Sequence, residues 1–281
     1  MEAPRHVLIT GAAGAIGGAT ARRLRATWPS TRFALLDRDA STMRALAEEL
    51  GNASIHAADL RDIASLPGVV ARIEGRAIRH GAGMPLEGAE RGAREGATTM
   101  PLDGLVNCAG AMWVRHVATW DWSDAEALLA IDFLAPLRLQ DLVVHGMVER
   151  GAHGVIVNIA SMAGKVPLKG CTYYGASKAG LAMASEIARA DLAPHGIRVV
   201  TVYPGPVKSQ LEQGARDAYG GGGVFGRFAP TGNPDELARL IARAIENDEP
   251  RVIYPRLYRV GWSATNAASW FALSYGPPPV A

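Results

Sequence analysis

Tyr174 and Lys178 suggest chemistry most directly, because they place a phenol and an ammonium group one helical turn apart. Side chains four residues apart on a helix share a face, so Lys178 can stabilise the phenolate of Tyr174. A free tyrosine titrates near pH ~10 and needs such help to exchange protons at neutral pH. The same pair also occurs on solvated helix faces, so by itself it assigns no function.

Ser161 adds a hydroxyl 13 residues before Tyr174, directly after an apolar run at 154–160. A buried parallel strand presents the side chain at its end to the ligand crevice of an open α/β sheet. Ser161, Tyr174 and Lys178 are therefore candidate catalytic residues. A hydrolase with Ser161 as nucleophile is an alternative, but no Gly-x-Ser-x-Gly elbow surrounds it and no histidine is placed as a base.

A glycine-rich turn near the start of the chain predicts a dinucleotide site. It follows a short apolar strand and precedes a helical pattern, which is the context such a motif requires. Glycine allows close approach of a pyrophosphate, and the helix N-terminus offers unpaired N–H groups. The candidate residues of this turn are Gly11, Gly14, Ala15, Ile16 and Gly17. A glycine turn in an unrelated α/β protein is the alternative.

Asp37 ends the next apolar strand, 20 residues beyond Gly17. A carboxylate there can accept hydrogen bonds from an adenosine ribose and would repel a 2′-phosphate. We therefore expect NAD to be preferred to NADP. Arg38 is the complication, because an arginine directly after the strand could bind a phosphate.

These motifs together resemble those of the short-chain dehydrogenase/reductase family, in its compact single-domain branch. The resemblance covers roughly residues 5–255, interrupted near 65–100, and rests on motifs that occur in the family's order. It implies that Ser161, Tyr174 and Lys178 are the catalytic serine, tyrosine and lysine, and that Lys178 also holds the nicotinamide ribose. Further cofactor contacts are implied at Asp59 and Leu60 for adenine, at Asn107, Ala109 and Gly110, and at Pro204, Gly205, Val207 and Ser209 for nicotinamide.

Two residues depart from the family's pattern. Asp132 stands where the family usually has a catalytic asparagine, and an ionised aspartate can only accept hydrogen bonds. Aspartate in place of asparagine changes little if the backbone carbonyl of this residue serves the catalytic role by holding a water near Lys178. If the side-chain amide must donate a hydrogen bond, that donor is lost. Ala15 stands where the middle glycine is common, and Gly14 instead matches the spacing of the family's larger branch.

The alternation of apolar runs and helical patterns predicts a doubly wound, Rossmann-type α/β fold with seven parallel strands and helices on both faces. We expect one domain over 1–281, with a surface insertion at 66–101, a substrate lid at 208–232 around a run of four glycines, and an apolar C-terminal extension at 256–281. Expected strands are 6–10, 32–36, 54–58, 104–107, 154–160, 197–203 and 251–254. Expected helices are 16–27, 40–50, 123–149, 173–193 and 234–247.

Composition narrows the function classes. A formal charge of +2 with 20% charged residues gives no basic field for nucleic acid. Cys108 and Cys171 have no metal-ligand spacing, and a disulfide between them is not expected. No stretch reaches the ~20 apolar residues of a membrane span, and the first strand begins too early for a signal peptide. We expect a cytoplasmic homodimer or homotetramer without a metal.

The residues predict hydride exchange between a nicotinamide cofactor and a secondary alcohol or ketone. Tyr174 would act as general acid and base, and Ser161 would stabilise charge on the substrate oxygen. Trp113, Met162 and Phe225 are candidates for an apolar substrate pocket. The alternative within the fold is a dinucleotide-sensing regulator with weak turnover, although such proteins usually lose the tyrosine or the lysine.

Overall fold

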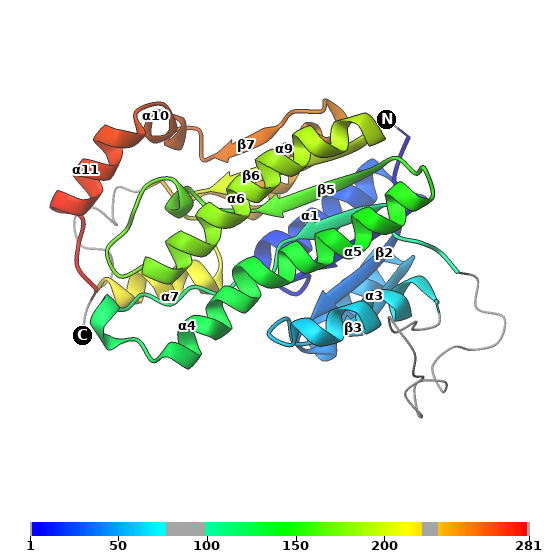
Figure 1. The fold of residues 1–281 in the computed structure, drawn as a ribbon, viewed down its shortest axis with the longest axis horizontal. Helices are drawn as coiled ribbons and strands as arrows, with labels where there is room; N and C mark the ends of the chain where they lie inside the picture. The colour runs from blue at the N-terminus through cyan, green and yellow to red at the C-terminus, as the bar shows by residue number, and fades with distance from the viewer. Residues whose placement is uncertain (1, 77–98, 221–229, 280–281) are drawn as a thin grey trace.

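A seven-stranded parallel sheet forms the centre of the molecule (Figure 1), in a computed structural model that describes residues 2–76, 99–220 and 230–279. The strand order is β3-β2-β1-β4-β5-β6-β7, and every neighbouring pair is parallel. The doubly wound α/β fold predicted from the sequence is confirmed. The strands are β1 (His6–Thr10), β2 (Arg32–Asp37), β3 (Ala53–Ala57), β4 (Gly104–Asn107), β5 (Gly154–Ile159), β6 (Ile197–Pro204) and β7 (Arg251–Tyr254).

Helices cover both faces of this sheet. One face packs against α1 (Ala15–Thr27), α2 (Arg44–Leu50) and α9 (Pro234–Glu246). The other face packs against α3 (Leu66–Glu74), α5 (Ala135–Glu149) and α6 (Thr172–Leu192), with α4 (Trp122–Leu129) ahead of α5. Among the described residues, the remaining α-helices are α7 (Gln210–Ala218), α10 (Tyr258–Ser263) and α11 (Thr265–Tyr275).

The inner strands are largely apolar on both faces, as a sheet covered by helices requires. Successive side chains of a strand point to opposite faces. In β1, Val7 and Ile9 join the core under α1 and α9, whereas Leu8 joins the core under α3 and α5. All three side chains are fully buried.

The order of the strands places the ligand site. From β1 the chain continues to β2 and β3 on one side of β1. It then crosses to β4 on the other side, so the direction in which strands are added reverses between β1 and β4. A crevice opens beyond the carboxyl ends of the strands at such a point. Thr10 ends β1 and Asn107 ends β4, so the glycine turn and the segment after β4 meet there.

The helix predicted over 123–149 contains a change of pitch. Residues Ala130–Leu134 form a π-helical turn between α4 and α5, with Asp132 at its centre. Pro136 follows within the first turn of α5 and has no N–H, so the α-helical donor to the Asp132 carbonyl is missing. π-Turns inside helices occur frequently at functional sites.

The first part of the predicted surface insertion at 66–101 is instead a helix of the core. Residues Leu66–Glu74 form α3, whose Leu66, Val69 and Ile73 side chains are buried against the sheet and α5. The glycine and charged residues that follow in the segment obscure the apolar pattern of this short helix in the sequence. Residues 77–98 lie outside the described part of the chain.

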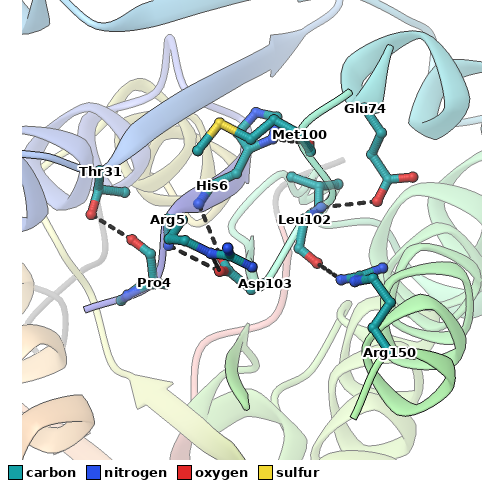
Figure 2. Close-up of polar contacts among 9 residues, drawn as sticks. All are labelled: Pro4, Arg5, His6, Thr31, Glu74, Met100, Leu102, Asp103 and Arg150. Carbon is teal, nitrogen blue, oxygen red and sulfur yellow. Dashed lines mark hydrogen bonds and ion pairs between the residues drawn. The ribbon is translucent and has the colours of Figure 1, made fainter. Parts of the chain in front are cut away.

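Polar contacts fix the two segments that flank 77–98 (Figure 2). The buried Glu74 carboxylate accepts a hydrogen bond from the Leu102 N–H at 2.9 Å, and the Leu102 carbonyl accepts one from Arg150 at 2.9 Å. The Asp103 carboxylate accepts the backbone N–H groups of Arg5 and His6 at 3.0 and 2.8 Å. These contacts tie the end of α3 and the start of β4 to β1.

The other two segments singled out in the sequence also contain helices. Within 208–232, Ser209 caps α7 by accepting the Glu212 N–H, while residues 221–229 lie outside the described part. The apolar segment 256–281 forms α10 and α11. Within the described residues, no helix combines the length and apolar character that crossing a membrane requires.

Candidate active site

A cleft of about 1410 Å³ extends from the glycine turn to α11 across the carboxyl ends of the strands. Most residues predicted from the sequence line it. They are Gly11, Gly14, Ala15, Ile16, Gly17, Asp37, Arg38, Asp59, Leu60, Ala109, Gly110, Ser161, Tyr174, Lys178, Pro204, Gly205, Val207 and Ser209. Trp113 and Met162 line it as well, and Phe225 lies outside the described residues.

The glycine turn is held against the segment after β4. Gly11 has a φ of +63°, and a Cβ atom there would lie 2.6 Å from the Ala109 Cα. Only glycine combines that backbone conformation with so close an approach. Thr10 fixes the contact, because its hydroxyl accepts the N–H groups of Cys108 and Ala109, both at 3.1 Å.

The first turn of α1 fits an anionic pyrophosphate. Gly14 precedes the helix without a side-chain cap, and no acidic residue occupies the first turn. The N–H groups of that turn and the positive end of the helix dipole therefore face the cleft. A Cβ atom at Gly17 would lie 2.2 Å from the Gly11 carbonyl oxygen, so this position also requires glycine. Ala15 is accommodated as the first residue of the helix.

Charged side chains gather at the far end of this half of the cleft. Asp37 accepts the Ala13 N–H at 3.1 Å and the Arg38 N–H at 2.7 Å, which aims its carboxylate at the glycine turn. Arg38 is exposed beside it. Asp59 binds Arg61 through both carboxylate oxygens, and this contact lowers the pKa of Asp59. Arg61 lines the cleft and was missed in the sequence, although it lies only two residues after Asp59.

Ser161, Tyr174 and Lys178 meet beyond the end of β5. The Ser161 hydroxyl accepts the Ala163 N–H at 3.1 Å, which fixes the first turn after the strand. Tyr174 and Lys178 lie on one face of α6, with the Lys178 Nζ 5.9 Å from the Tyr174 ring centroid. Lys178 donates to the Ile159 carbonyl at 3.2 Å, so the end of β5 positions the ammonium group.

Asp132 lies behind this group and does not line the cleft. Its Oδ1 accepts the Ala111 N–H at 2.8 Å and lies 3.7 Å from the Lys178 Nζ. Its Oδ2 is buried without a hydrogen-bond partner among the described residues. Burial raises the pKa of Asp132 to about 6, against the opposing effects of Lys178 and the Ala111 N–H. A buried carboxyl with one unpartnered oxygen fits the protonated form at mildly acidic pH.

Tyr174 is held as a neutral phenol by its surroundings. Burial raises its pKa, the negative charge of Asp132 raises it further, and a hydrogen bond with Ser161 opposes both. The net effect of these surroundings is to raise the pKa of Tyr174, while the Lys178 ammonium group lies near Asp132 and donates to the Ile159 carbonyl. A neutral phenol at pH 7 is a proton donor.

Asn107 is a correction to the predicted cofactor shell. It is buried and does not line the cleft. Its amide donates to the Pro136 carbonyl at 3.1 Å and to the Asn158 side chain at 2.8 Å, so it joins β4 to β5 and α5. The sequence match did not show which way a side chain at the end of a buried strand points.

The remaining predicted contacts come from the segment after β6. Pro204 ends that strand, Val207 pairs with Gly232, and Ser209 caps α7. A Cβ atom at Gly205 would lie 2.7 Å from the Tyr258 ring, so glycine lets α10 pack onto the cleft. Cys108, which lines the cleft, and the buried Cys171 are both free thiols.

Comparison with known proteins agrees with this geometry. A sequence model described as short chain dehydrogenase matches residues 91–220. A D-threitol dehydrogenase from Mycolicibacterium smegmatis is 31% identical over 235 residues, which cover 82% of each chain. The chain belongs to the short-chain dehydrogenase/reductase family. It is therefore a member of a family of oxidoreductases.

Two further relatives show the range of this family. The ketoacyl reductase HetN from Nostoc sp. is 32% identical over 154 residues, 54% of this chain but only 51% of that protein. The structure of a short-chain dehydrogenase from Sphingobium yanoikuyae in complex with NADPH superposes with a TM-score of 0.72 at 25% identity. That alignment covers 99% of this chain and 98% of the other.

Proposed function

We propose that this short-chain dehydrogenase/reductase transfers a hydride between a nicotinamide cofactor and a secondary alcohol or ketone. The observation that carries the proposal is the meeting of Ser161, Tyr174 and Lys178 at the end of β5, in the same cleft as the uncapped N-terminus of α1. When bound, the cofactor supplies the redox chemistry, and the protein orients and polarises the substrate.

Each of the three side chains has a role that its position supports. Tyr174 donates its phenolic proton to the substrate oxygen in reduction and, as phenolate, accepts it in oxidation. Ser161 donates a hydrogen bond to the same oxygen and stabilises the charge that develops there. Lys178 holds a positive charge near the Tyr174 ring and would bind the nicotinamide ribose.

We infer that NAD is preferred to NADP. The Asp37 carboxylate is fixed by two backbone N–H groups at the turn, where a 2′-phosphate would meet its negative charge. Arg38 and Arg61 line the same end of the cleft and are the groups that could bind a phosphate. Asp59 already engages Arg61 through both oxygens, which leaves Arg38 as the main competitor.

The substrate is inferred to be apolar. Trp113 and Met162 line the part of the cleft beyond Tyr174, where most other side chains are also hydrophobic. Among the described residues, no histidine lines the cleft, which argues against a hydrolase that uses Ser161.

A dinucleotide-binding regulator with weak turnover is the second candidate. The contact between Asp132 and Lys178 favours it, because that carboxylate competes with Tyr174 for the ammonium group. Such a protein would bind the cofactor without turning over alcohols or ketones.

A homo-oligomer also remains a prediction. The outward side of α6 exposes Met183 and Ile187, which a second copy of the chain could cover. Light scattering of the purified protein would give the assembly size, and a monomer at micromolar concentration would contradict the expectation.

Purified protein should be titrated with NAD, NADH, NADP and NADPH by calorimetry. It should then be mixed with secondary alcohols and ketones of increasing size, with turnover read from the absorbance of the reduced nicotinamide. Cofactor binding with turnover supports the oxidoreductase, and binding without turnover supports the regulator. Absence of cofactor binding contradicts both.

A further inference from the structure

The chain continues for two helices after the last strand, and these helices lie at the substrate end of the cleft. Figure 1 shows α10 and α11 at the end of the molecule toward which the strand arrows point. This C-terminal segment had no assigned role in the sequence beyond its apolar character. Its position beside the cleft raises the question of what it contributes to binding.

Specific contacts fix this segment at its beginning. The Trp262 ring packs edge-on against the buried Tyr203 of β6, with ring centroids 4.6 Å apart. The Lys165 ammonium lies 4.6 Å from the Trp262 centroid and the Arg251 guanidinium 5.8 Å from it. Such cation–π contacts add to the apolar packing. Helix α10 is thereby anchored on β6 and β7.

The far end of the segment is fixed as well. Lys169, in the loop before α6, donates to the Gly276 carbonyl at 3.1 Å. A Cβ atom at Gly170 would lie 2.9 Å from Val114 and 3.1 Å from Pro279, so the tail packs closely against this loop. With both ends fixed, α10 and α11 form a wall rather than a free extension.

The wall is apolar and contains several small side chains. Its residues that line the cleft are Tyr258, Val260, Gly261, Ala268, Phe271 and Ala272. Apolar side chains from the loop after β5 and from α7 line the cleft with it, namely Met162, Val166, Leu168, Leu211 and Ala215. The small residues leave room for a ligand between the wall and the side chains from the loop after β5 and from α7. The large residues provide apolar area for contact with that ligand.

Charge is scarce in this part of the cleft. Among the described lining residues it is confined to Lys169, Glu212 and Arg216, and Glu212 pairs with Arg216. An ionic group on the ligand would meet few partners here. A hydrocarbon group would instead be removed from water on several sides.

We propose that α10 and α11 form the binding site for a bulky apolar substituent on the reacting carbon of the substrate, such as a fused aromatic ring system or a long alkyl chain. This inference rests on the proposed alcohol or ketone chemistry. The small residues at positions 268 and 272 set the size of the group that the wall admits.

The test fills this space in the full-length protein. Ala272→Trp narrows the cleft, and Ala268→Leu narrows it less. Ala267→Trp is the matched control, because Ala267 is exposed on the same helix and does not line the cleft. Turnover of acetonaphthone and of butanone is compared in all variants, and acetonaphthone binding is measured by calorimetry in the presence of cofactor.

For Ala272→Trp we expect the ratio of kcat/KM for acetonaphthone to kcat/KM for butanone to fall by about tenfold or more. Ala268→Leu should lower it in the same direction by less, and Ala267→Trp should leave it as in the parent. If Ala272→Trp and Ala268→Leu both leave the ratio unchanged, or if Ala267→Trp lowers it equally, the proposal is overturned.

Calorimetry separates this proposal from the reaction itself. If no ketone is turned over but acetonaphthone binds, and Ala272→Trp weakens that binding while Ala267→Trp does not, the wall is confirmed and the proposed chemistry is wrong. If the parent does not bind acetonaphthone at all, the wall has no such role. Melting temperature and cofactor affinity show whether a variant has lost its fold. If Ala272→Trp does not fold, the milder variant Ala268→Leu is used for the test.

Discussion

The two halves of the cleft are built from different parts of the protein. The half that faces α1 consists largely of backbone and glycine positions after β1 and β4, and of charged side chains at the ends of β2 and β3. The half beyond Tyr174 consists of apolar side chains from the loop after β5, from α7 and from the two C-terminal helices. The first is fixed by the register of the sheet, the second by contacts between side chains.

This difference separates chemistry from specificity. A change of one residue at Gly11 or Gly17 would bring a Cβ atom within 2.6 Å of neighbouring backbone, so the cofactor half tolerates little variation. Helices α10 and α11 contain no fully buried residue, and the wall that they form carries both small and large side chains. Substrate preference can therefore change there without disturbing Ser161, Tyr174 or Lys178.

The catalytic group at the junction of the halves gives the largest expected effect. Tyr174→Phe removes the proton that is transferred and leaves the aromatic ring, so kcat should fall by about 10²–10⁴-fold while cofactor affinity stays close to that of the parent. Steady-state kinetics and calorimetry measure the two quantities.

Tyr173→Phe is the matched control for this experiment. Tyr173 precedes Tyr174 on α6, packs edge-on against Trp120 at 5.0 Å, and does not line the cleft. Loss of the Tyr173 hydroxyl in this variant should leave kcat within a few-fold of the value for the parent protein. Equal losses in both variants, or retained activity in Tyr174→Phe, would contradict the role of Tyr174.

The rigidity of the cofactor half can be tested at two adjacent glycines. Gly17→Ala places a Cβ atom 2.2 Å from the Gly11 carbonyl oxygen, whereas Gly18→Ala places one 3.4 Å from its nearest neighbours. Gly17→Ala should weaken cofactor binding by at least about tenfold and destabilise the protein by about 1–3 kcal/mol. Gly18→Ala should bind as the parent does. Calorimetry and thermal melting would show the contrast, and similar behaviour of the two variants would mean that the turn adapts.

Much of the cofactor half could be predicted because its motifs are local in sequence. A strand, a glycine turn and a helix in succession specify the first contact, and Asp37 follows at the end of the next strand. The strands themselves were confirmed to within a residue or two, because apolar runs in a covered parallel sheet are short and distinct. Asn107 was misread because a motif gives a position but not the direction of a side chain.

Apart from Trp113 and Met162, the substrate half could not be predicted, because it is assembled from distant segments. The contact of Lys169 with Gly276 joins residues 107 positions apart, and Trp262 of α10 packs on Tyr203 of β6. Neither contact has a local signature. Helix α3 was missed for another reason, since the glycine-rich sequence after it masked nine residues with a clear apolar face.

The cofactor preference is a smaller effect within the same half. Asp37→Asn keeps an oxygen that can accept the Ala13 N–H and removes the negative charge. The ratio of kcat/KM for NADP to kcat/KM for NAD should rise by about tenfold, which corresponds to roughly 1.4 kcal/mol of lost repulsion. Asp39→Asn is the control, since Asp39 caps the following turn and does not line the cleft. A parent enzyme that already favours NADP would show that Arg38 outweighs Asp37.

The smallest effect is expected behind the catalytic group, at Asp132. Asp132→Asn removes a negative charge that raises the pKa of Tyr174 and restores the amide usual in the family. Without that charge the phenolate is easier to form, so the pKa of Tyr174 should fall. The rising limb of the pH profile for alcohol oxidation should move to lower pH by the same amount, and the rate at neutral pH should increase by up to about tenfold.

The absorbance of tyrosinate tests this shift without turnover. The signal of Tyr174 is the difference between the titration of a protein that has Tyr174 and that of its Tyr174→Phe variant, measured once with Asp132 and once with Asp132→Asn. Asp124→Asn is the control, because Asp124 forms a surface pair with Arg115 at 2.6 Å and lies on α4 ahead of the π-turn. It should leave the titration of Tyr174 unchanged. If Asp132→Asn instead abolishes turnover while the fold and the cofactor affinity are retained, the carboxylate itself is needed at the Lys178 ammonium. The departure from asparagine would then be part of how this enzyme works.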